Sequence, residues 1–371
     1  MFRHLSMAPT MRAWQYVNGV TAKTLVGRLE DSIALHVAAS APDKSSLTKD
    51  QLLIRVISAS LNPADYKMPE SDWFGRLFGL RADAQPGMDF CGRIVAKHDA
   101  LNNTNSRYRE GQRVFGSLAK ASRFGTLGEF IVASTSEIAP APEQIGSDQV
   151  AALGTSAGIA YKSLLLAGVK EGSSVFINGG SGGVGTYMIQ LAKVLGATNV
   201  TVTTSSSNIN LVRNLGADDI IDYKMADVLA ELGRKGQIFD AVFDNVGIPQ
   251  NLYQESHAFL KKSGVYVQVA ADPTVWATFR ILGIMSKSLV SPTGRAFRFA
   301  VDKGNGADYE VIARWVAEGK VKPVIGRTVE FEENVPEAYA ELRRGRSRGK
   351  IVVHVGGGVR SENGRERVNS G

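Results

Sequence analysis

A glycine-rich turn between an apolar strand and an apolar helix is the segment of this sequence whose residue types and spacing best fit chemistry. After a strand predicted over residues 174–178, Gly180, Gly182 and Gly185 form the pattern G-x-G-x-x-G. The first glycine permits the tight turn, the second lets a pyrophosphate approach the backbone, and the third lets helix and strand pack closely. N–H groups at the helix start then bind phosphate. The predicted contacts are Gly180, Ser181, Gly182, Gly183 and Val184.

Polar side chains without a carboxylate end the next predicted strand, residues 199–204. In dinucleotide-binding folds an acidic residue near this point usually binds the ribose 2′-hydroxyl of NAD. This sequence has hydroxyl and amide groups instead, at Thr204, Ser205, Ser206, Ser207 and Asn208. A 2′-phosphate carries about −1.5 to −2 charges, so a carboxylate would repel it and these donors would bind it. The segment therefore favours NADP as the cofactor; alternatively, these serines only cap a helix.

Composition limits the class of protein. The chain has 371 residues, 44% hydrophobic and 21% charged, which is typical of a globular protein with room for two domains. No run approaches the ~20 apolar residues that cross a bilayer. The single cysteine, Cys91, excludes an internal disulfide framework and indicates a reducing compartment. The net charge of +7 comes from scattered basic residues, apart from the run over residues 343–350, and predicts a surface that attracts anionic ligands rather than nucleic acid.

The N-terminus has two interpretations. The first 29 residues contain Arg3, Arg12, Lys23 and Arg28 and no acidic residue, which resembles a mitochondrial presequence. The interpretation we prefer is a cytoplasmic protein whose residues 1–10 are a flexible tail before the first strand.

Two patterns divide the rest of the chain. Residues 11–147 are predicted to form mostly strands and turns. Residues 148–300 alternate strands and helices, beginning with one helix over residues 151–166, which is typical of a parallel sheet with helices on both faces. Residues 301–355 look like a return to the first domain, and residues 356–371 are predicted to be a disordered tail. The predicted fold class is α/β.

Six segments, in order, resemble the medium-chain dehydrogenase/reductase superfamily, in its zinc-independent quinone oxidoreductase-like branch. They are Asn62–Lys67, Pro86–Gly92, Leu153–Gly158, Gly180–Gly185, Asn214–Lys224 and Phe243–Gly247. The resemblance covers about residues 11–355. It implies a GroES-like β-barrel catalytic domain that is interrupted by a Rossmann domain, a doubly wound parallel sheet that binds NADP.

The resemblance also indicates which metal ligands the chain lacks. Zinc-dependent members have a Cys where this chain has about Asn62, and a His-Glu pair where it has Met88 and Asp89. Their structural-zinc lobe needs four closely spaced cysteines, and this chain has one Cys. Because Met and Asn are poor zinc ligands, we predict no metal.

Further cofactor contacts are implied by the resemblance, position by position. Thr155 would touch the nicotinamide side, and Tyr223 would lie by the adenosine phosphate. Asn62 belongs to a turn that faces the cofactor in relatives, and Lys350 stands where relatives often place a basic residue near it. The remaining contacts follow the fourth and fifth strands, beside the ribose and nicotinamide: Asn245, Val246, Gly247, Val269 and Ala270.

Without zinc, the resemblance implies hydride transfer from NADPH to an activated C=C bond, as in an enone or enoyl thioester, or to a quinone. Negative charge then develops on an oxygen, which the protein must stabilise. Tyr66 and Lys67 are the candidate catalytic residues, because they follow the turn that faces the cofactor; Lys67 would stabilise the enolate or supply a proton. Alternatively, Tyr66 packs in the barrel and Lys67 is solvated.

Two apolar segments have alternative interpretations. Trp73, Phe74, Phe78 and Leu80 form either a wall of the substrate site or a satellite cluster on the barrel, and residues 276–285 line the site or pair with a second subunit in a homodimer. The predicted ligand is a small-molecule substrate, with no nucleic-acid partner and no membrane span. Two other functions stay open: a trans-acting enoyl reductase that docks on a biosynthetic synthase, and a non-catalytic NADPH-binding protein.

Overall fold

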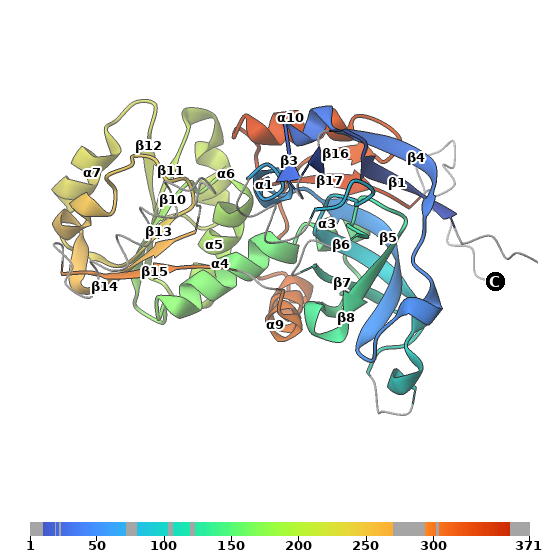
Figure 1. The fold of residues 1–371 in the computed structure, drawn as a ribbon. Helices are drawn as coiled ribbons and strands as arrows, with labels where there is room; N and C mark the ends of the chain where they lie inside the picture. The colour runs from blue at the N-terminus through green and yellow to red at the C-terminus, as the bar shows by residue number, and fades with distance from the viewer. Residues whose placement is uncertain are drawn as a thin grey trace, which may run out of the picture.

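Two large sheets organise the chain and lie on the left and right of Figure 1. The computed structural model describes residues 10–18, 20–21, 24–71, 80–102, 107–118, 123–269, 294–301 and 304–356. Trp73, Phe74 and Phe78, residues 276–285 and Ala270 lie outside these ranges, as do most of the two predicted tails. Within them, no helix is long and apolar enough to span a membrane.

All six strands of the first sheet run parallel. They are β10 (Ser174–Asn178), β11 (Asn199–Thr204), β12 (Asp219–Asp222), β13 (Phe239–Asp244), β14 (Leu260–Gln268) and β15 (Ala296–Phe299). Their spatial order, β12-β11-β10-β13-β14-β15, is that of a doubly wound dinucleotide-binding fold. Val175, Phe176 and Ile177 on the central strand are fully buried, as expected where both faces are covered. Such folds bind ligands at the carboxyl ends of the strands beside the central one.

Helices flank this parallel sheet (Figure 1). They are α4 (Gly154–Leu166), α5 (Gly183–Val194), α6 (Ile209–Asn214) and α7 (Val228–Lys235). α4 lies beside α5, and the buried residues of α5 include Met188, Ile189 and Leu191. The Asp227 side chain accepts a hydrogen bond from the Ala230 N–H and so caps the start of α7.

The helix predicted over residues 151–166 is present as α4, but it begins three residues later than predicted and follows a separate short helix. α3 (Ser147–Ala151) packs against strands of the second sheet, and α4 begins at Gly154. The N–H of Thr155, in the first turn of α4, donates to the Asp89 carboxylate at 2.8 Å. A Cβ on Gly154 would lie 2.3 Å from Asp89 Cγ, so this close approach needs glycine. A distant carboxylate therefore supplies the acceptor that the first turn of a helix lacks.

The second sheet is mostly antiparallel. Its strands are β16 (Ile325–Glu330), β17 (Lys350–His354), β5 (Gln51–Ser60), β6 (Asp89–Lys97), β7 (Arg113–Ser117) and β9 (Ile138–Pro140), and β8 (Phe130–Ser134) also pairs with β5. β1 (Thr10–Tyr16) pairs with β4 (Ile33–Ser40), and β2 (Val20–Thr21) with β3 (Thr24–Leu25). The buried core includes Ile54, Phe90, Val114, Ile131 and Phe331.

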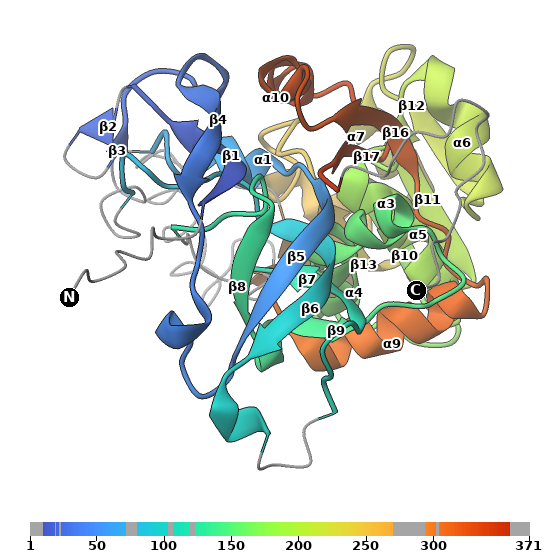
Figure 2. The ribbon, with the colours of Figure 1, turned by 90° about the vertical axis from the view of Figure 1, so that its right-hand side faces the viewer.

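After the first sheet the chain returns to the second, as Figure 2 shows from the side. α9 (Gly306–Ala317) packs against β9 and α4, and α10 (Val335–Arg343) packs against α1 (Pro63–Lys67). β16 and β17 then complete the second sheet. Short 3₁₀ turns lie at Leu29–Asp31, Lys44–Ser46, Asp99–Leu101, Thr135–Glu137, Ser206–Asn208 and Gln254–Ala258. The predicted α/β class, a doubly wound sheet within a β-rich domain, is confirmed.

A polar contact joins the last strand to α3. His354 Nδ1 lies 3.2 Å from Asp148 Oδ1, and Ser58 Oγ donates to the same oxygen. The hydrogen bond with Asp148 raises the pKa of His354. Burial raises the pKa of Asp148, but the hydrogen bonds from His354 and Ser58 outweigh burial, so its pKa is lowered overall. β17 is thereby fastened to the beginning of the segment that leads into the parallel sheet.

We expect the His354→Gln variant to lose stability at mildly acidic pH. Because pairing raises the folded-state pKa above 6.5, the contribution of His354 is fully present below pH 6.5 and is lost as the pH rises through the folded-state pKa. Both side chains are about one-third exposed, so the loss is at most about 1 kcal/mol, or about 2–4 °C. Melting temperatures at pH 6 and pH 9 test this. An equal loss at both pH values, or an equal loss in the exposed control His36→Gln, contradicts it.

Candidate cofactor and active site

The turn between β10 and α5 has the geometry of a phosphate cradle. Gly179 has a φ of +87°, a value that favours glycine. A Cβ on Gly185 would lie 2.1 Å from the Gly179 carbonyl oxygen, so the close contact of strand and helix requires glycine there. For a Cβ on Gly182 the nearest atom would be 3.8 Å away, so this part of the backbone is open to a ligand.

The hydroxyl-rich loop, residues 204–208, lies against this turn. Asn208 Nδ2 donates to Ser181 Oγ at 3.2 Å and to Ser205 Oγ at 3.3 Å, and the Ser205 and Ser207 hydroxyls are 3.2 Å apart. Two buried oxygens of the loop, Thr204 Oγ1 and Asn208 Oδ1, have no hydrogen-bond partner among the described residues. Because an unpaired buried polar atom is costly, these residues fit a polar ligand such as a nucleotide.

One carboxylate approaches the loop from the neighbouring strand. Ser206 Oγ donates to Asp222 Oδ2 at the end of β12, and this hydrogen bond lowers the pKa of Asp222. Tyr223 follows, 54% exposed, and its backbone N–H donates to the Thr204 carbonyl. The structure thus brings Tyr223 and the hydroxyl-rich loop together, with the Ser206 hydroxyl engaged by Asp222.

A cation that the sequence analysis missed lies at the same loop. Arg348 Nη2 donates to the Ser207 carbonyl at 3.2 Å, and the N–H of the next residue, Gly349, donates to the Ser181 carbonyl at 3.0 Å. The basic run over residues 343–350 was the signal for such a residue. Its partner loop could not be known, because Arg348 and Ser207 are 141 residues apart.

The turns after β13 and β14 reach the same edge of the sheet. The Asn245 N–H donates to the carbonyl of the last residue of β10, and the Val269 N–H donates to the Asp244 carbonyl. Asn245 Oδ1 is buried with no hydrogen-bond partner among the residues described. Val246 packs on the glycine turn, because a Cβ on Gly179 would lie 2.5 Å from Val246 Cγ2. These predicted contact residues therefore adjoin the phosphate cradle.

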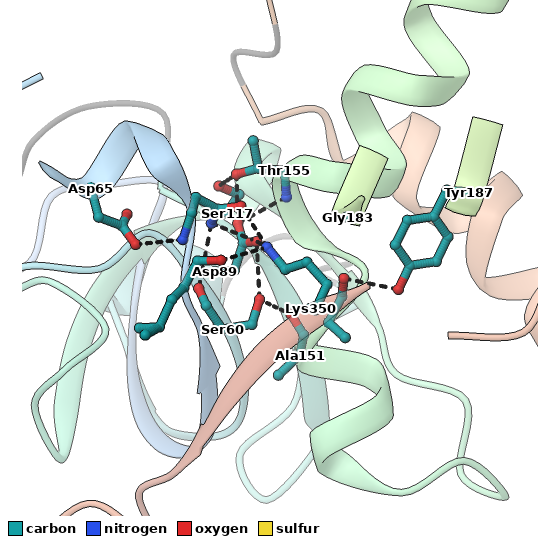
Figure 3. A network of polar contacts seen from close by, with 12 residues as sticks. Ser60, Asp65, Asp89, Ser117, Ala151, Thr155, Gly183, Tyr187 and Lys350 are labelled. Carbon is teal, nitrogen blue, oxygen red and sulfur yellow. Dashed lines mark hydrogen bonds and ion pairs between the residues drawn. The ribbon is translucent and has the colours of Figure 1, made fainter. Parts of the chain in front are cut away.

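A fully buried carboxylate, Asp89 at the start of β6, is the centre of the network in Figure 3. Its Oδ1 accepts hydrogen bonds from the N–H and the hydroxyl of Thr155, at 2.8 and 2.6 Å. Its Oδ2 accepts from Asn62 Nδ2 at 2.9 Å and lies 3.3 Å from the Lys350 ammonium. Elements from three parts of the sequence therefore meet at one carboxylate.

Lys350 is 3% exposed. Its ammonium has three N–H groups, and each of them has an acceptor. The acceptors are Asn62 Oδ1 at 2.5 Å, Leu61 O at 2.9 Å and Asp89 Oδ2 at 3.3 Å. The ammonium of Lys350, a residue predicted to lie near the cofactor, is therefore engaged by the protein itself, because a buried cation needs these partners. Its methylenes adjoin the cradle instead, since a Cβ on Gly183 would lie 3.1 Å from Lys350 Cδ.

The hydrogen-bond network extends from Thr155 to Ser117. A hydroxyl has one proton, and that of Thr155 is donated to Asp89. In the 2.9 Å hydrogen bond between Ser117 Oγ and Thr155 Oγ1, Ser117 is therefore the donor. Asp89 thus orients both Asn62 and Thr155, two of the predicted cofactor contacts.

The same geometry does not suit zinc. Asn62 and Asp89, at two of the positions that correspond to zinc ligands in the zinc-dependent branch, both hold the Lys350 ammonium. A zinc ion and an ammonium cannot share these oxygens, and the third position, Met88, offers only a thioether. Within the part of the chain that the structure describes, no group of three or more His, Cys, Asp or Glu residues could hold a metal ion.

α1 places the two predicted catalytic side chains in different surroundings. Tyr66 is 6% exposed, and its ring centroid lies 4.2 Å from the guanidinium of Arg343, which also pairs with Glu30 and Glu70. Burial raises the pKa of the Tyr66 phenol. This environment fits the packing interpretation of Tyr66. Lys67 is half-buried, and its ammonium makes no hydrogen bond or ion pair within the described ranges.

Asp65 holds the beginning of α1. Its Oδ2 accepts from the Asn62 N–H at 2.8 Å and from the Tyr339 hydroxyl at 3.3 Å. Burial raises the pKa of Asp65 to about 7. The side chain caps the helix and so fixes the turn that carries Asn62 and, at the other end of α1, Lys67.

Known proteins share both halves of this architecture. Residues 48–143 match the alcohol dehydrogenase GroES-like domain, and residues 215–353 match the zinc-binding dehydrogenase domain. Although the second domain is named for zinc binding, Asn62, Met88 and Asp89 of this chain do not form a zinc site. The trans-enoyl reductase pgmF of Aspergillus terreus is 40% identical over 361 residues, which are 93% of this chain and 96% of that protein. The chain belongs to the medium-chain dehydrogenase/reductase superfamily. It is an oxidoreductase with a nicotinamide cofactor.

Two further relatives confirm the branch of this superfamily. The 2-methylene-furan-3-one reductase of Solanum lycopersicum is 31% identical over 362 residues, 94% of this chain and 80% of that protein. The solved structure of the quinone oxidoreductase from Coxiella burnetii superposes with a TM-score of 0.78 at 29% identity, covering 94% of this chain and all of that one. The prediction that the chain belongs to the quinone oxidoreductase-like branch is thereby confirmed.

The Lys350→Met variant should lose about 3–5 kcal/mol of stability, because it leaves the Asp89 carboxylate buried without a cation. Adding Asp89→Asn removes the unpaired charge and should restore part of that loss. Urea unfolding at pH 7 measures both. The control Lys320→Met breaks an exposed pair with Glu318 and should change stability by less than about 0.5 kcal/mol. Losses of the same size for the two lysines would contradict the role of the buried pair.

Proposed function

We propose that the chain is an NADPH-dependent reductase that transfers hydride to a C=C bond conjugated with a carbonyl or thioester, or to a quinone. The observation that carries the proposal is the ammonium of Lys350 on Asn62 and Asp89. It occupies oxygens that a catalytic zinc would need, so the acceptor must be one that takes hydride without a zinc-bound oxygen. The names of relatives support the same acceptors: 2-methylene-furan-3-one reductase, alkenal/one oxidoreductase and quinone oxidoreductase.

The choice of NADP rests on the loop that follows β11. The Ser205 and Ser207 hydroxyls share one hydrogen bond and so keep one donor for a ligand, Asn208 orients Ser181 and Ser205, and Arg348 adds a permanent cation beside them. A 2′-phosphate is bound by such charge-assisted hydrogen bonds, whereas the 2′-hydroxyl of NAD needs an acceptor. The carboxylate nearby, Asp222, is taken up by Ser206 and by the Lys224 N–H. This arrangement supports NADP over NAD.

Lys67 is the residue that we propose to assist the chemistry. When bound, the nicotinamide supplies the hydride, which adds to the β-carbon of the acceptor. The acceptor's carbonyl oxygen then becomes negative, and the Lys67 ammonium, which is unpaired among the described residues, stabilises that charge. Asp65 and the Lys350–Asp89 pair hold α1 and thereby aim Lys67.

A second function is favoured by one relative. The protein that is 40% identical is named a trans-enoyl reductase. In that case the substrate is an enoyl thioester carried on a biosynthetic synthase, and the reductase docks on the synthase. The hydride chemistry is the same, and the two functions differ in the form of the substrate that is turned over.

The Arg348→Gln variant tests the cofactor proposal. Loss of a charge-assisted contact should raise the KM for NADPH by about 10- to 100-fold and leave the KM for NADH unchanged, because NADH has no 2′-phosphate. Steady-state kinetics with both cofactors measure this. The neighbouring Arg346→Gln serves as the control, with a smaller effect. The assignment of NADP is contradicted if Arg348→Gln raises the KM for NADPH and for NADH equally. It is also contradicted if the wild type has no preference between the two cofactors.

Oxidation of NADPH tests the function itself, with three acceptors: 9,10-phenanthrenequinone, a small enone and an enoyl thioester. We expect turnover of at least one of them by the purified chain. Turnover of a thioester only when it is attached to a synthase carrier would favour the trans-acting function. Tight binding of NADPH with no turnover of any of these would show a cofactor-binding protein instead and refute the proposal.

With the acceptor that is turned over, Lys67→Met should lower kcat by about 100-fold, or roughly 3 kcal/mol, with little change in the KM for NADPH. Met retains the length of the side chain and removes the charge. Lys170→Met is the matched control and should have wild-type kinetics. Lys170 is exposed and precedes the first residue of β10, whereas the candidate site lies at the carboxyl end of that strand. An unchanged kcat in Lys67→Met removes this residue from the mechanism.

A further inference from the structure

Asp244, the last residue of β13, is a buried carboxylate with an unusual set of partners. It is 2% exposed, and both of its oxygens are fully used. The donors come from its own turn and from two neighbouring strands: Asn178 Nδ2, the N–H groups of Val246 and Gly247, the Tyr266 hydroxyl and Gln268 Nε2, at 2.8–3.2 Å. No Lys, Arg or His in the described ranges forms an ion pair with it. Neutral donors alone hold this charge.

The contacts continue from Asp244 to the phosphate cradle. Asn178 uses one N–H of its amide on Asp244 Oδ1 and the other on the Ile248 carbonyl, at 2.9 and 2.8 Å. The Asn178 oxygen accepts from the Thr203 hydroxyl at 2.7 Å, and Thr203 in turn accepts from the Gly179 N–H at 2.8 Å. One unbroken series of hydrogen bonds therefore crosses the strands β11, β10, β13 and β14 at their carboxyl ends.

The direction of every bond in this series is determined. Asn178 donates twice through nitrogen and accepts through oxygen, so its amide has one orientation. Asp244 Oδ1 accepts from three N–H groups, which a carboxylate oxygen does and an amide nitrogen cannot. Replacing Asp244 by Asn exchanges one of the two oxygens for an NH2 group, which in either orientation faces buried donors, without changing the size of the side chain.

The series joins two turns that serve different halves of a dinucleotide. The glycine turn beginning at Gly179 contains the predicted pyrophosphate contacts, and the turn over residues 245–248 contains Asn245, Val246 and Gly247, which are predicted to lie beside the ribose and nicotinamide. The turns also touch directly, because Val246 packs against Gly179. Asp244 further receives the Val269 N–H on its backbone carbonyl. Asp244 thus fixes the distance between the turns on both sides of the cofactor.

We propose that Asp244 is a positioning residue that lets the cofactor's two halves bind at once. The proposal rests on the nicotinamide cofactor and on no particular substrate. It predicts that loss of the carboxylate frees the turn over residues 245–248, while the hydroxyl-rich loop over residues 204–208, which is held by its own contacts, stays intact. Affinity for the whole cofactor then falls, and affinity for its adenosine half does not.

Binding to the Asp244→Asn variant of the full chain tests this by calorimetry, with NADPH and with adenosine 2′,5′-bisphosphate, the half that lacks the nicotinamide. We expect a loss of about 10-fold or more for NADPH and a change below about 2-fold for the bisphosphate. If the wild type prefers NADH, the matching probes are NADH and ADP. No substrate is needed, so failure of the proposed reductase activity does not affect the outcome.

Two variants keep the test decisive if Asp244→Asn folds poorly. Tyr266→Phe removes a single donor to Asp244 Oδ2 and should weaken NADPH by about 3- to 10-fold, again without weakening the bisphosphate. Asp240→Asn is the matched control, because Asp240 lies on the same strand but at its other end, paired with Lys261, and should bind both probes like the wild type. Equal weakening of both probes, or unchanged NADPH affinity in Asp244→Asn and Tyr266→Phe, would overturn the proposal.

Discussion

The buried ion pair of Lys350 with Asp89 is the constraint on which the rest of the structure depends. Removing both charges from water costs several kcal/mol for each ion, and the cost is offset only if the remaining hydrogen-bonding capacity is also satisfied. Asp89 lies on β6 and Lys350 on β17, and their partners come from Ser60 of β5, from Leu61 and Asn62 before α1, and from α4. Because all of them are needed, the pair holds the catalytic domain, its C-terminal return and the entrance to the parallel sheet in one arrangement.

Each domain therefore contributes one buried carboxylate that organises its share of the site, and the two are satisfied differently. Asp89 is balanced by a cation and locks α1 against α4. Asp244 is balanced by neutral donors and locks the turns at the edge of the parallel sheet. A cation beside Asp244 would add charge where a cofactor lies, whereas the cation at Asp89 takes the place of a metal. The division suits an enzyme whose cofactor supplies the redox chemistry and whose barrel supplies orientation.

Local patterns predicted what local forces decide. The strand over residues 174–178, the glycine turn and the alternation after it appear in the structure as predicted, since strand, turn and helix preferences act over a few residues. The start of α4 was placed three residues too early because the acceptor for its first turn, Asp89, is remote in sequence. The partners of Lys350 and of Arg348 were missed for the same reason. Tyr66 had two interpretations because only the tertiary fold brings Arg343 over its ring.

The place of β17 in its sheet bears on how the chain is made. Val352 and His354 pair with Ser60 and Ser58 of β5, so one of the first strands to be synthesised waits for the last one described. Until then residues 58–60 of β5, beyond the part paired with β8, expose unpaired backbone groups, which can pair with other chains. The parallel sheet lies wholly between these two strands in the sequence and needs neither of them. As the chain leaves the ribosome, the nucleotide-binding sheet can fold first, and the domain that begins the sequence is completed last.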